Sequence, residues 1–235
     1  MKKILAIAII ILISGQCYSQ QILFHKDVKD TTMGKVGPNL KNFHHFYIGF
    51  GFIGGDNNGA GNDIVLGKST NFVFGYRYKL KICKHYAIGY DLAFNSYTFA
   101  LEQKKGKIFP DTILHNKKET FSYYNVGLSP YMRFNYGRRG NSIGKFIDLG
   151  AYGDWTYTAR TFAKDKVENG NIVKITTSNL KYINSFNYGA LVRIGFNRWV
   201  IFGSYRLSDI FKTSDTYNFS ELPRTTLGLQ VGIHK

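Results

Sequence analysis

The sequence predicts an all-β protein, an eight-stranded antiparallel up-and-down transmembrane β-barrel with short periplasmic turns and long extracellular loops. Three observations lead to this fold class. Apolar and polar residues alternate with a period of two in many segments, short and long connections alternate between those segments, and the chain starts like an exported protein. The expected strands cover about 43–53, 69–82, 84–101, 120–136, 145–162, 180–197, 199–211 and 222–234.

Residues 144–160 show the alternation most clearly. Ile147, Leu149 and Trp155 fall on one face of an extended strand, whereas Asp148 and Asp154 fall on the other. The same alternation predicts that Arg160 lies on the polar face.

The connections between the segments alternate in length. The turn at Cys83, residues 137–144 and the dipeptide Asn197-Arg198 are short, whereas the intervening connections are longer and polar. Outer-membrane barrels place short turns on the periplasmic side and longer loops on the extracellular side. An even number of strands then brings both ends of the barrel to the periplasmic side.

The N-terminus has the pattern of an export signal. Lys2 and Lys3 precede an apolar run of about ten residues, which is too short to span a membrane as a helix. The expected organisation is therefore a removed signal peptide at 1–20, a periplasmic lead-in at 21–42 and an outer-membrane β-barrel at 43–235. The expected location is the outer membrane of a Gram-negative bacterium, so nucleic acid is excluded as a partner even though the formal net charge is +16.

The composition of the polar face indicates which side of the barrel meets solvent. Small residues and glycine dominate it, with a few arginines and aspartates, whereas a water-facing surface is usually rich in lysine and glutamate. This composition suits the crowded interior of a narrow barrel, which side chains fill. The alternative is a soluble, lipocalin-like binding barrel, which would place Phe186, Tyr188 and Val192 inside.

Charged residues on the polar face are expected to share the barrel lumen. Opposite charges should pair there, because an unpaired charge in a confined interior is costly. The expected result is a structural network that plugs the barrel; the alternative is a narrow porin-like pore for small solutes, anions among them. The expected lumen charges are Arg77, Asp91, Arg133, Asp148, Asp154, Arg160, Arg193, Arg206 and Arg224.

Lysines concentrate in the long loops, where they would lie at or above the outer leaflet. Lipopolysaccharide carries phosphates at that level, so we expect outer-membrane lipids and lipopolysaccharide to be the partners of these loops. The simpler alternative is that the lysines are only solvated. The lysines concerned are Lys104, Lys105, Lys107, Lys117, Lys118, Lys164, Lys166 and Lys174.

No motif for catalysis, a cofactor or a metal was identified. The chain has no Gly-x-Ser-x-Gly elbow, and Asp148 and Asp154 would lie roughly 20 Å apart along a strand, too far to share a proton. His44 and His45 are adjacent and point to opposite faces, which argues against a metal site at the rim with His85 and His234. We therefore expect a non-enzymatic structural or envelope-interaction protein.

The C-terminal segment resembles the end of the Bacteroidota outer-membrane β-barrel domain family. The stretches SYRLSDIFK at 204–212 and ELPRTTLGLQVGI at 221–233 carry the resemblance. It implies a small porin-like barrel of the cell envelope and recognition by the barrel assembly machinery, but no single activity. The chain ends Ile233-His234-Lys235, whereas strands of such barrels usually end on an aromatic residue. The matching motif positions are Tyr205, Leu207, Ser208, Ile210, Phe211, Lys212, Leu222, Pro223, Gly228, Leu229, Val231 and Gly232.

Overall fold

A computed structural model describes residues 37–55, 61–137, 140, 142–167, 169–212 and 219–234. The predicted signal peptide and residues 21–36 of the lead-in lie outside these residues. No described helix is long and apolar enough to span a membrane. The described strands are β1 (Asn42–Gly54), β2 (Thr70–Lys81), β3 (Tyr86–Ala100), β4 (Lys118–Tyr136), β5 (Lys145–Lys166), β6 (Ile172–Ser178), β7 (Phe186–Phe196), β8 (Trp199–Arg206) and β9 (Thr225–Ile233).

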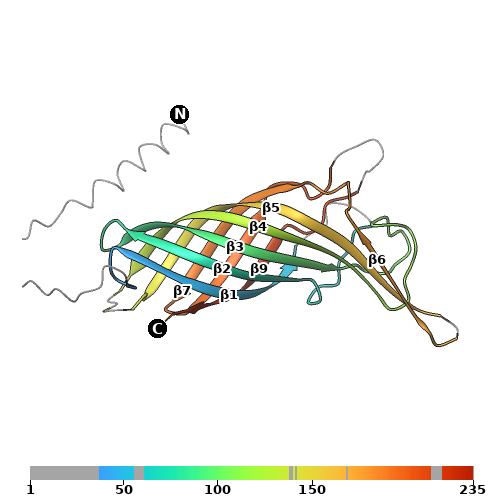
Figure 1. The fold of residues 1–235 in the computed structure, drawn as a ribbon, viewed down its shortest axis with the longest axis horizontal. Helices are drawn as coiled ribbons and strands as arrows, with labels where there is room; N and C mark the ends of the chain where they lie inside the picture. The colour runs from blue at the N-terminus through green and yellow to red at the C-terminus, as the bar shows by residue number, and fades with distance from the viewer. Residues whose placement is uncertain are drawn as a thin grey trace, which may run out of the picture. The chain divides into compact units, whose positions relative to one another are not determined.

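The strands form an antiparallel sheet that closes on itself (Figure 1). Neighbouring strands pair in the order β4-β3-β2-β1-β9-β8-β7-β5, and β4 also pairs with β5, which completes the circle. Of the nine strands only β6 stands outside this circle, so the ring has eight strands. The first and last ring strands join along a register from Phe46↔Ile233 to Gly54↔Thr225, so the ring has no free edge at that seam.

The ring has two different ends, which we call the turn end and the loop end. The turn end carries the connections β2–β3, β4–β5 and β7–β8; the last of these is the dipeptide Asn197-Arg198 between the paired residues Phe196 and Trp199. Asn197 has a φ of 56°, the left-handed conformation that a two-residue hairpin requires and that asparagine tolerates. The other connections form the loop end.

The eight predicted segments correspond to the eight ring strands, but the loop end differs from the prediction. β6 lies inside a connection predicted to be a long polar loop, pairs only with residues 160–166 of β5, and is exposed at all seven residues. Figure 1 shows β6 and the adjoining part of β5 as a ribbon that extends past the neighbouring ring strands. β8 ends at Arg206 instead of residue 211, because Ile210 and Phe211 turn inward and become buried.

The outer face of the ring is apolar and the inner face is polar. Phe186 is 60% exposed, Tyr188 50% and Val192 46%, whereas Arg77 and Arg193 are each 1% exposed. The soluble lipocalin-like alternative required the reverse arrangement for these three apolar residues and is therefore wrong. The apolar face is continuous around the ring, because each strand contributes large apolar side chains at alternate positions.

A β-bulge in β5 reverses the two faces near the loop end. Tyr124 pairs with Thr158, but the next residue, Asn125, pairs with Thr156, so Tyr157 is the extra residue of β5. One extra residue moves every later side chain of the strand to the opposite face. Arg160 is therefore exposed on the outer face, where it donates a hydrogen bond to the Tyr124 hydroxyl, and its predicted place in the lumen is wrong.

Candidate functional site

Asp91 on β3 is the centre of a charge network inside the barrel. Arg77 of β2 donates to its Oδ1 through Nε at 3.0 Å and to its Oδ2 through Nη2 at 3.0 Å. Arg193 of β7 donates to Oδ2 at 2.8 Å, and the Tyr47 hydroxyl of β1 at 3.1 Å. One carboxylate thus pairs with two buried guanidinium groups, which is the environment that keeps a buried carboxylate ionised.

Arg133 and Asp148 form the second half of the network. Arg133 of β4 makes a bidentate pair with Asp148 of β5 through Nε at 2.7 Å and Nη2 at 2.8 Å. The Arg193 Nη1 atom lies 3.6 Å from Asp148 Oδ2 and connects the two halves. The Arg133 guanidinium also stacks over the Phe146 ring at 3.6 Å, a favourable cation–π geometry.

The network connects almost the whole ring. Gln230 of β9 accepts a hydrogen bond from Arg77 at 2.8 Å, so β1, β2, β3, β4, β5, β7 and β9 all contribute a side chain. Five of the nine predicted lumen charges are brought together here: Arg77, Asp91, Arg133, Asp148 and Arg193. Because these side chains reach across the lumen to one another, they fill it at this level.

Asp154 lies in a separate layer and has only amide partners among the described residues. The Asn125 side chain donates to it at 3.3 Å, and that of Asn95 at 3.4 Å. The Thr156 hydroxyl then links Asn125 to Asn187 with hydrogen bonds of 2.9 and 3.1 Å. This layer continues the polar filling of the barrel toward the loop end.

Two small cavities remain among these lumen side chains. The one between Asp91 and Asp154 has a volume of about 40 Å³, and the one between Asp154 and Arg206 about 10 Å³. A single water molecule needs roughly 10–15 Å³ by this measure, so each cavity holds a few waters at most.

An apolar plug closes the loop end of the barrel. Phe109, from the loop between β3 and β4, is fully buried, and its ring centroid lies 4.7 Å from that of Phe211 in the β8–β9 loop. It also lies 5.2 Å from the ring of Phe121 on β4. Two loops therefore fold inward over the polar lumen. The buried members of the plug are Ile53, Ile64, Phe99, Leu101, Phe109, Phe121, Tyr123, Ala159, Ile183, Ile210, Phe211 and Leu222.

The two remaining predicted lumen arginines hold the β8–β9 loop instead of joining the network. Arg206 is 5% exposed and pairs with Glu221 at 2.7 Å. Glu221 also accepts the backbone N–H groups of Ile210 and Phe211 at 2.7 and 3.1 Å, which fixes the inward turn of these residues. Arg224 pairs with Asp209 near the rim.

The loop lysines do not form one solvated group. Lys107 is 4% exposed and lies 2.5 Å from Glu119, so its predicted place in an exposed basic surface is wrong. Lys104 is half exposed and pairs with Asp63 at 2.7 Å. The exposed members of the predicted set are Lys104, Lys105, Lys117, Lys118, Lys166 and Lys174, with Lys164 half-buried.

Three of these lysines are direct cross-strand neighbours, and we call them the basic row. Lys118 of β4 pairs with Lys164 of β5, which pairs with Lys174 of β6. Directly opposed residues of antiparallel strands lie about 5 Å apart, and like charges at that spacing repel. The exposed Arg160 lies on the same face of β5, four residues before Lys164.

The C-terminal motif has a structural role in this fold. Ile210, Phe211 and Leu222 belong to the plug, and Pro223 is buried beside it. A Cβ atom at Gly228 would lie 2.3 Å from a backbone oxygen of β1, so glycine is required at the seam that closes the ring. Tyr205 and Leu207 are exposed. The β9 residues Leu229, Val231 and Gly232 at the seam, and the loop residues Ser208 and Lys212, complete the motif. Recognition by the barrel assembly machinery stays a prediction.

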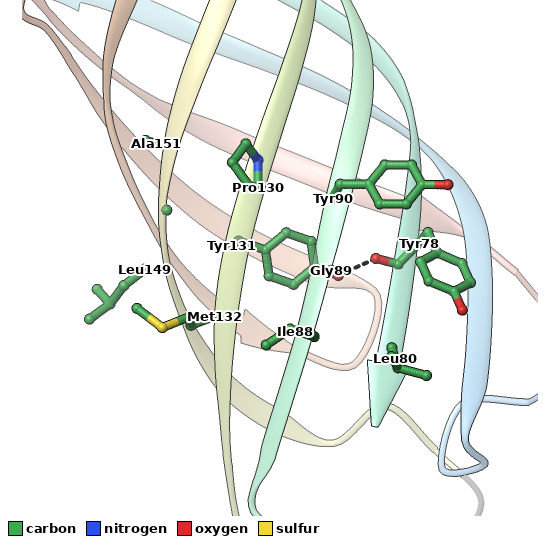
Figure 2. A pocket seen from close by; sticks show the side chains of 11 residues that line it. Tyr78, Leu80, Ile88, Gly89, Tyr90, Pro130, Tyr131, Met132, Leu149 and Ala151 are labelled. Atoms are coloured by element: carbon green, nitrogen blue, oxygen red, sulfur yellow. Dashed lines mark hydrogen bonds between the residues drawn. The ribbon is translucent and has the colours of Figure 1, made fainter. Parts of the chain in front are cut away.

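The outer face has an apolar groove of about 700 Å³ in its turn-end half, over β2–β5 (Figure 2). Pro130 lies in β4, where it has no N–H to donate, and the β4–β5 pairing is interrupted between Leu128 and Tyr131. Tyr131 reaches over Gly89 and donates to the Tyr78 carbonyl oxygen at 2.9 Å. The groove lies on the apolar outer face, on the other side of the barrel wall from the charge network, whose Arg193 lies 4.8 Å from the Tyr131 ring.

The histidines at the turn end do not form the rim metal group considered from the sequence. The His45 ring stacks on Phe43 at 5.0 Å and lies 5.4 Å from that of His234, whereas His44 faces outward. His85 lies 3.2 Å from the Asn135 carbonyl oxygen. In the described part of the chain, a close trio of possible metal ligands occurs instead at the loop end, at Asp111, His115 and Glu119.

No family model and no curated protein matches the chain. Among solved structures, it is similar to Ail, the attachment invasion locus protein of Yersinia pestis, with a TM-score of 0.36 and 15% sequence identity. The match covers 82% of this chain and 97% of that chain. At this TM-score and identity the similarity gives no information about function, which is inferred from the geometry of this chain alone.

Proposed function

We propose that this chain is a non-enzymatic integral β-barrel of a Gram-negative outer membrane, closed to solutes by its own side chains, that contacts anionic lipopolysaccharide through its loop end. The membrane assignment depends mainly on one observation: apolar and charged residues are distributed in the opposite way to those of a soluble protein. Large apolar side chains cover the outside of a closed ring while arginine and aspartate lie inside it. In water this outer face would be far larger than the apolar patches that soluble monomers expose, whereas a lipid bilayer covers it favourably.

Tryptophan fluorescence tests the membrane assignment. Trp155 and Trp199 are 61% and 60% exposed on the outer face. In vesicles that contain brominated lipids, both should be strongly quenched, because bromine atoms on acyl chains quench only nearby indoles. A folded chain that stays in the aqueous phase, with unquenched tryptophans, would contradict the assignment.

Two layers support a closed lumen. The charge network around Asp91 fills the middle of the barrel, and the plug around Phe109 covers the loop end. The network contains three guanidinium groups and two carboxylates. This excess of positive charge is the feature that would favour an anion pore. However, all five side chains are 2% exposed or less and pair with one another instead of lining an open passage.

The basic row supports contact with lipopolysaccharide. Three lysines held side by side repel one another, and a phosphate bound across them would remove that repulsion. Their location at the loop end, where β4, β5 and β6 pair, supports this contact, because lipopolysaccharide phosphates are expected above the apolar band.

A charge-neutralising triple variant tests this contact. Lys118→Gln, Lys164→Gln and Lys174→Gln together should weaken binding of lipopolysaccharide to the nanodisc-embedded barrel at least tenfold and flatten its salt dependence. Dephosphorylated lipopolysaccharide should bind the parent as weakly as intact lipopolysaccharide binds the variant. Equal affinities of parent and variant for intact lipopolysaccharide would refute this part of the proposal. The matched control makes the same change of charge at the turn end, at Lys41, Lys84 and Lys145.

A further inference from the structure

The loop between β3 and β4 is attached to the barrel by a buried polar cluster at the loop end. Glu119 is 2% exposed, Lys107 4% and His115 7%. The Oε2 atom of Glu119 accepts hydrogen bonds from Lys107 at 2.5 Å and from Gln103 at 2.7 Å. The other carboxylate oxygen, Oε1, is directed toward His115.

The His115 ring is oriented by Asp165, near the end of β5. His115 Nδ1 lies 2.6 Å from Asp165 Oδ2, a distance at which Nδ1 donates its proton to that carboxylate; in that tautomer the Nε2 lone pair is available to a cation. Nε2 lies 3.7 Å from Glu119 Oε1, beyond hydrogen-bond distance. Two buried electron-pair donors thus face each other, and a carboxylate fixes the far side of the imidazole, as in many protein metal sites.

The separations suit a small divalent cation. Zinc binds imidazole nitrogen and carboxylate oxygen at about 2.0–2.2 Å, so two ligand atoms of a tetrahedral site lie roughly 3.3–3.6 Å apart. The 3.7 Å between His115 and Glu119 is close to this value. Asp111 provides a third ligand atom, and the three lie within 4.8 Å of one another. Its side chain is 49% exposed, so it can rotate to close the remaining distance.

The charge of the cluster also favours a divalent cation. Asp111, Glu119 and Asp165 contribute three negative charges, and the ammonium of Lys107 contributes one positive charge. With a neutral imidazole the cluster has a net charge of −2, which one divalent cation neutralises. Lys107 donates to Glu119 Oε2 and, at 3.5 Å, to Asp111 Oδ1, which leaves the other oxygen of each carboxylate to the cation.

We propose that Asp111, His115 and Glu119 bind one zinc ion, with Asp165 as a positioning residue and water completing the coordination. An imidazole nitrogen among the ligands favours zinc over calcium or magnesium. Such a site fastens the loop that carries Phe109 to β4 and, through Asp165, to β5. It goes beyond the proposed membrane and lipopolysaccharide functions and depends on neither.

Isothermal titration of the metal-free, detergent-folded mature chain with zinc chloride at neutral pH tests the proposal. We expect one saturable site per chain. Asp111→Asn should weaken it at least tenfold, and Asp165→Asn by about 10–100-fold, which is typical when the partner of a metal-binding imidazole is lost. The matched control, Asp209→Asn, changes another exposed aspartate of the loop end and should leave the affinity unchanged.

A second measurement distinguishes the loss of a metal ligand from a general disturbance of the loop. Cobalt(II) bound in place of zinc should give the intense visible absorption of a tetrahedral site with an imidazole ligand, and His115→Gln should abolish it. The control His44→Gln, at the opposite end of the barrel, should retain it. The absence of saturable zinc binding to the parent, or an unchanged affinity in Asp111→Asn and Asp165→Asn, would overturn the proposal.

Discussion

Neutralising Asp91 should destabilise the barrel more than any single change at its rim. Asp91→Asn leaves the guanidinium groups of Arg77 and Arg193 buried at 1% exposure with the shared carboxylate charge removed. Breaking one partner of a buried ion pair typically costs about 3–5 kcal/mol, because the remaining charge stays buried without compensation. We therefore expect a loss of about 3–5 kcal/mol in the free energy of unfolding.

Equilibrium unfolding in denaturant measures this loss. The barrel folded in lipid vesicles is titrated with guanidinium chloride, and the fluorescence of Trp155 and Trp199, both on the outer face, reports departure from the bilayer. The control is Asp209→Asn, where a carboxylate that is 56% exposed should cost less than about 1 kcal/mol.

A double variant separates lost pairing from a general disturbance. Asp91→Asn combined with Arg193→Met should cost less than the sum of the two single changes, because removal of the arginine also removes an uncompensated charge. A loss below about 1 kcal/mol for Asp91→Asn, or strict additivity in the double variant, would refute the conclusion that the network is a coupled buried unit.

Three further predictions concern the plug, the packing between strands and the response to acid. Phe109→Ala should cost about 3–5 kcal/mol of unfolding free energy, because it leaves a cavity in the plug; a change below about 1 kcal/mol would contradict the burial. Gly189→Ala should prevent folding, judged by heat-modifiable gel migration, because its Cβ would lie 2.2 Å from a backbone oxygen of β8. Gly203→Ala, whose Cβ would meet only the end of a side chain at 3.1 Å, should fold. Hydrogen bonds from His115 and a backbone amide hold the pKa of Asp165 below its usual value, so its stabilisation of the loop is present above about pH 4 and lost as the pH falls through the folded pKa. Amide exchange in residues 101–117 should therefore accelerate relative to exchange in the ring strands only below about pH 4. A ratio of the two exchange rates that stays constant with pH would contradict the stabilising role of Asp165.

The ring strands and their faces could be predicted because alternation is a local property. A strand with one apolar face must turn that face toward lipid or a core, so Asp91, Asp148 and Arg193 could be assigned to one interior without knowledge of their partners. Which charges pair could not be predicted, since pairing depends on the cross-strand register. Arg77 lies directly opposite Asp91 only because Thr70 pairs with Thr98 at the other end of β2.

The errors all lie near the loop end, where local patterns stop determining the structure. The bulge at Tyr157 moved Arg160 outward, and no local feature of the sequence distinguishes this tyrosine from its neighbours. Phe109 gave a visible signal for the plug, since it is a large apolar residue in a connection rich in polar ones. Phe211 gave none, because it fell inside the strand expected at 199–211. No feature of the sequence indicated the burial of Lys107, because this burial depends on the loop folding back onto Glu119.

The folding of the loop between β3 and β4 back onto the barrel also explains why the candidate zinc site could not be predicted from the sequence. Asp111, His115 and Glu119 are four residues apart, a spacing that aligns side chains only on a helix. Here the irregular loop brings the first two toward the start of β4, and the orienting carboxylate of Asp165 comes from another strand.

Single-channel conductance in planar bilayers tests most directly whether the barrel is closed. The mature chain, folded in lipid and checked by heat-modifiable gel migration, would be added at neutral pH and high salt. We predict that the inserted protein shows no conductance steps, because the charge network and the plug occupy successive levels of the lumen. Steady, reproducible steps would contradict a closed barrel and would make the arginines around Asp91 the lining of an anion pore.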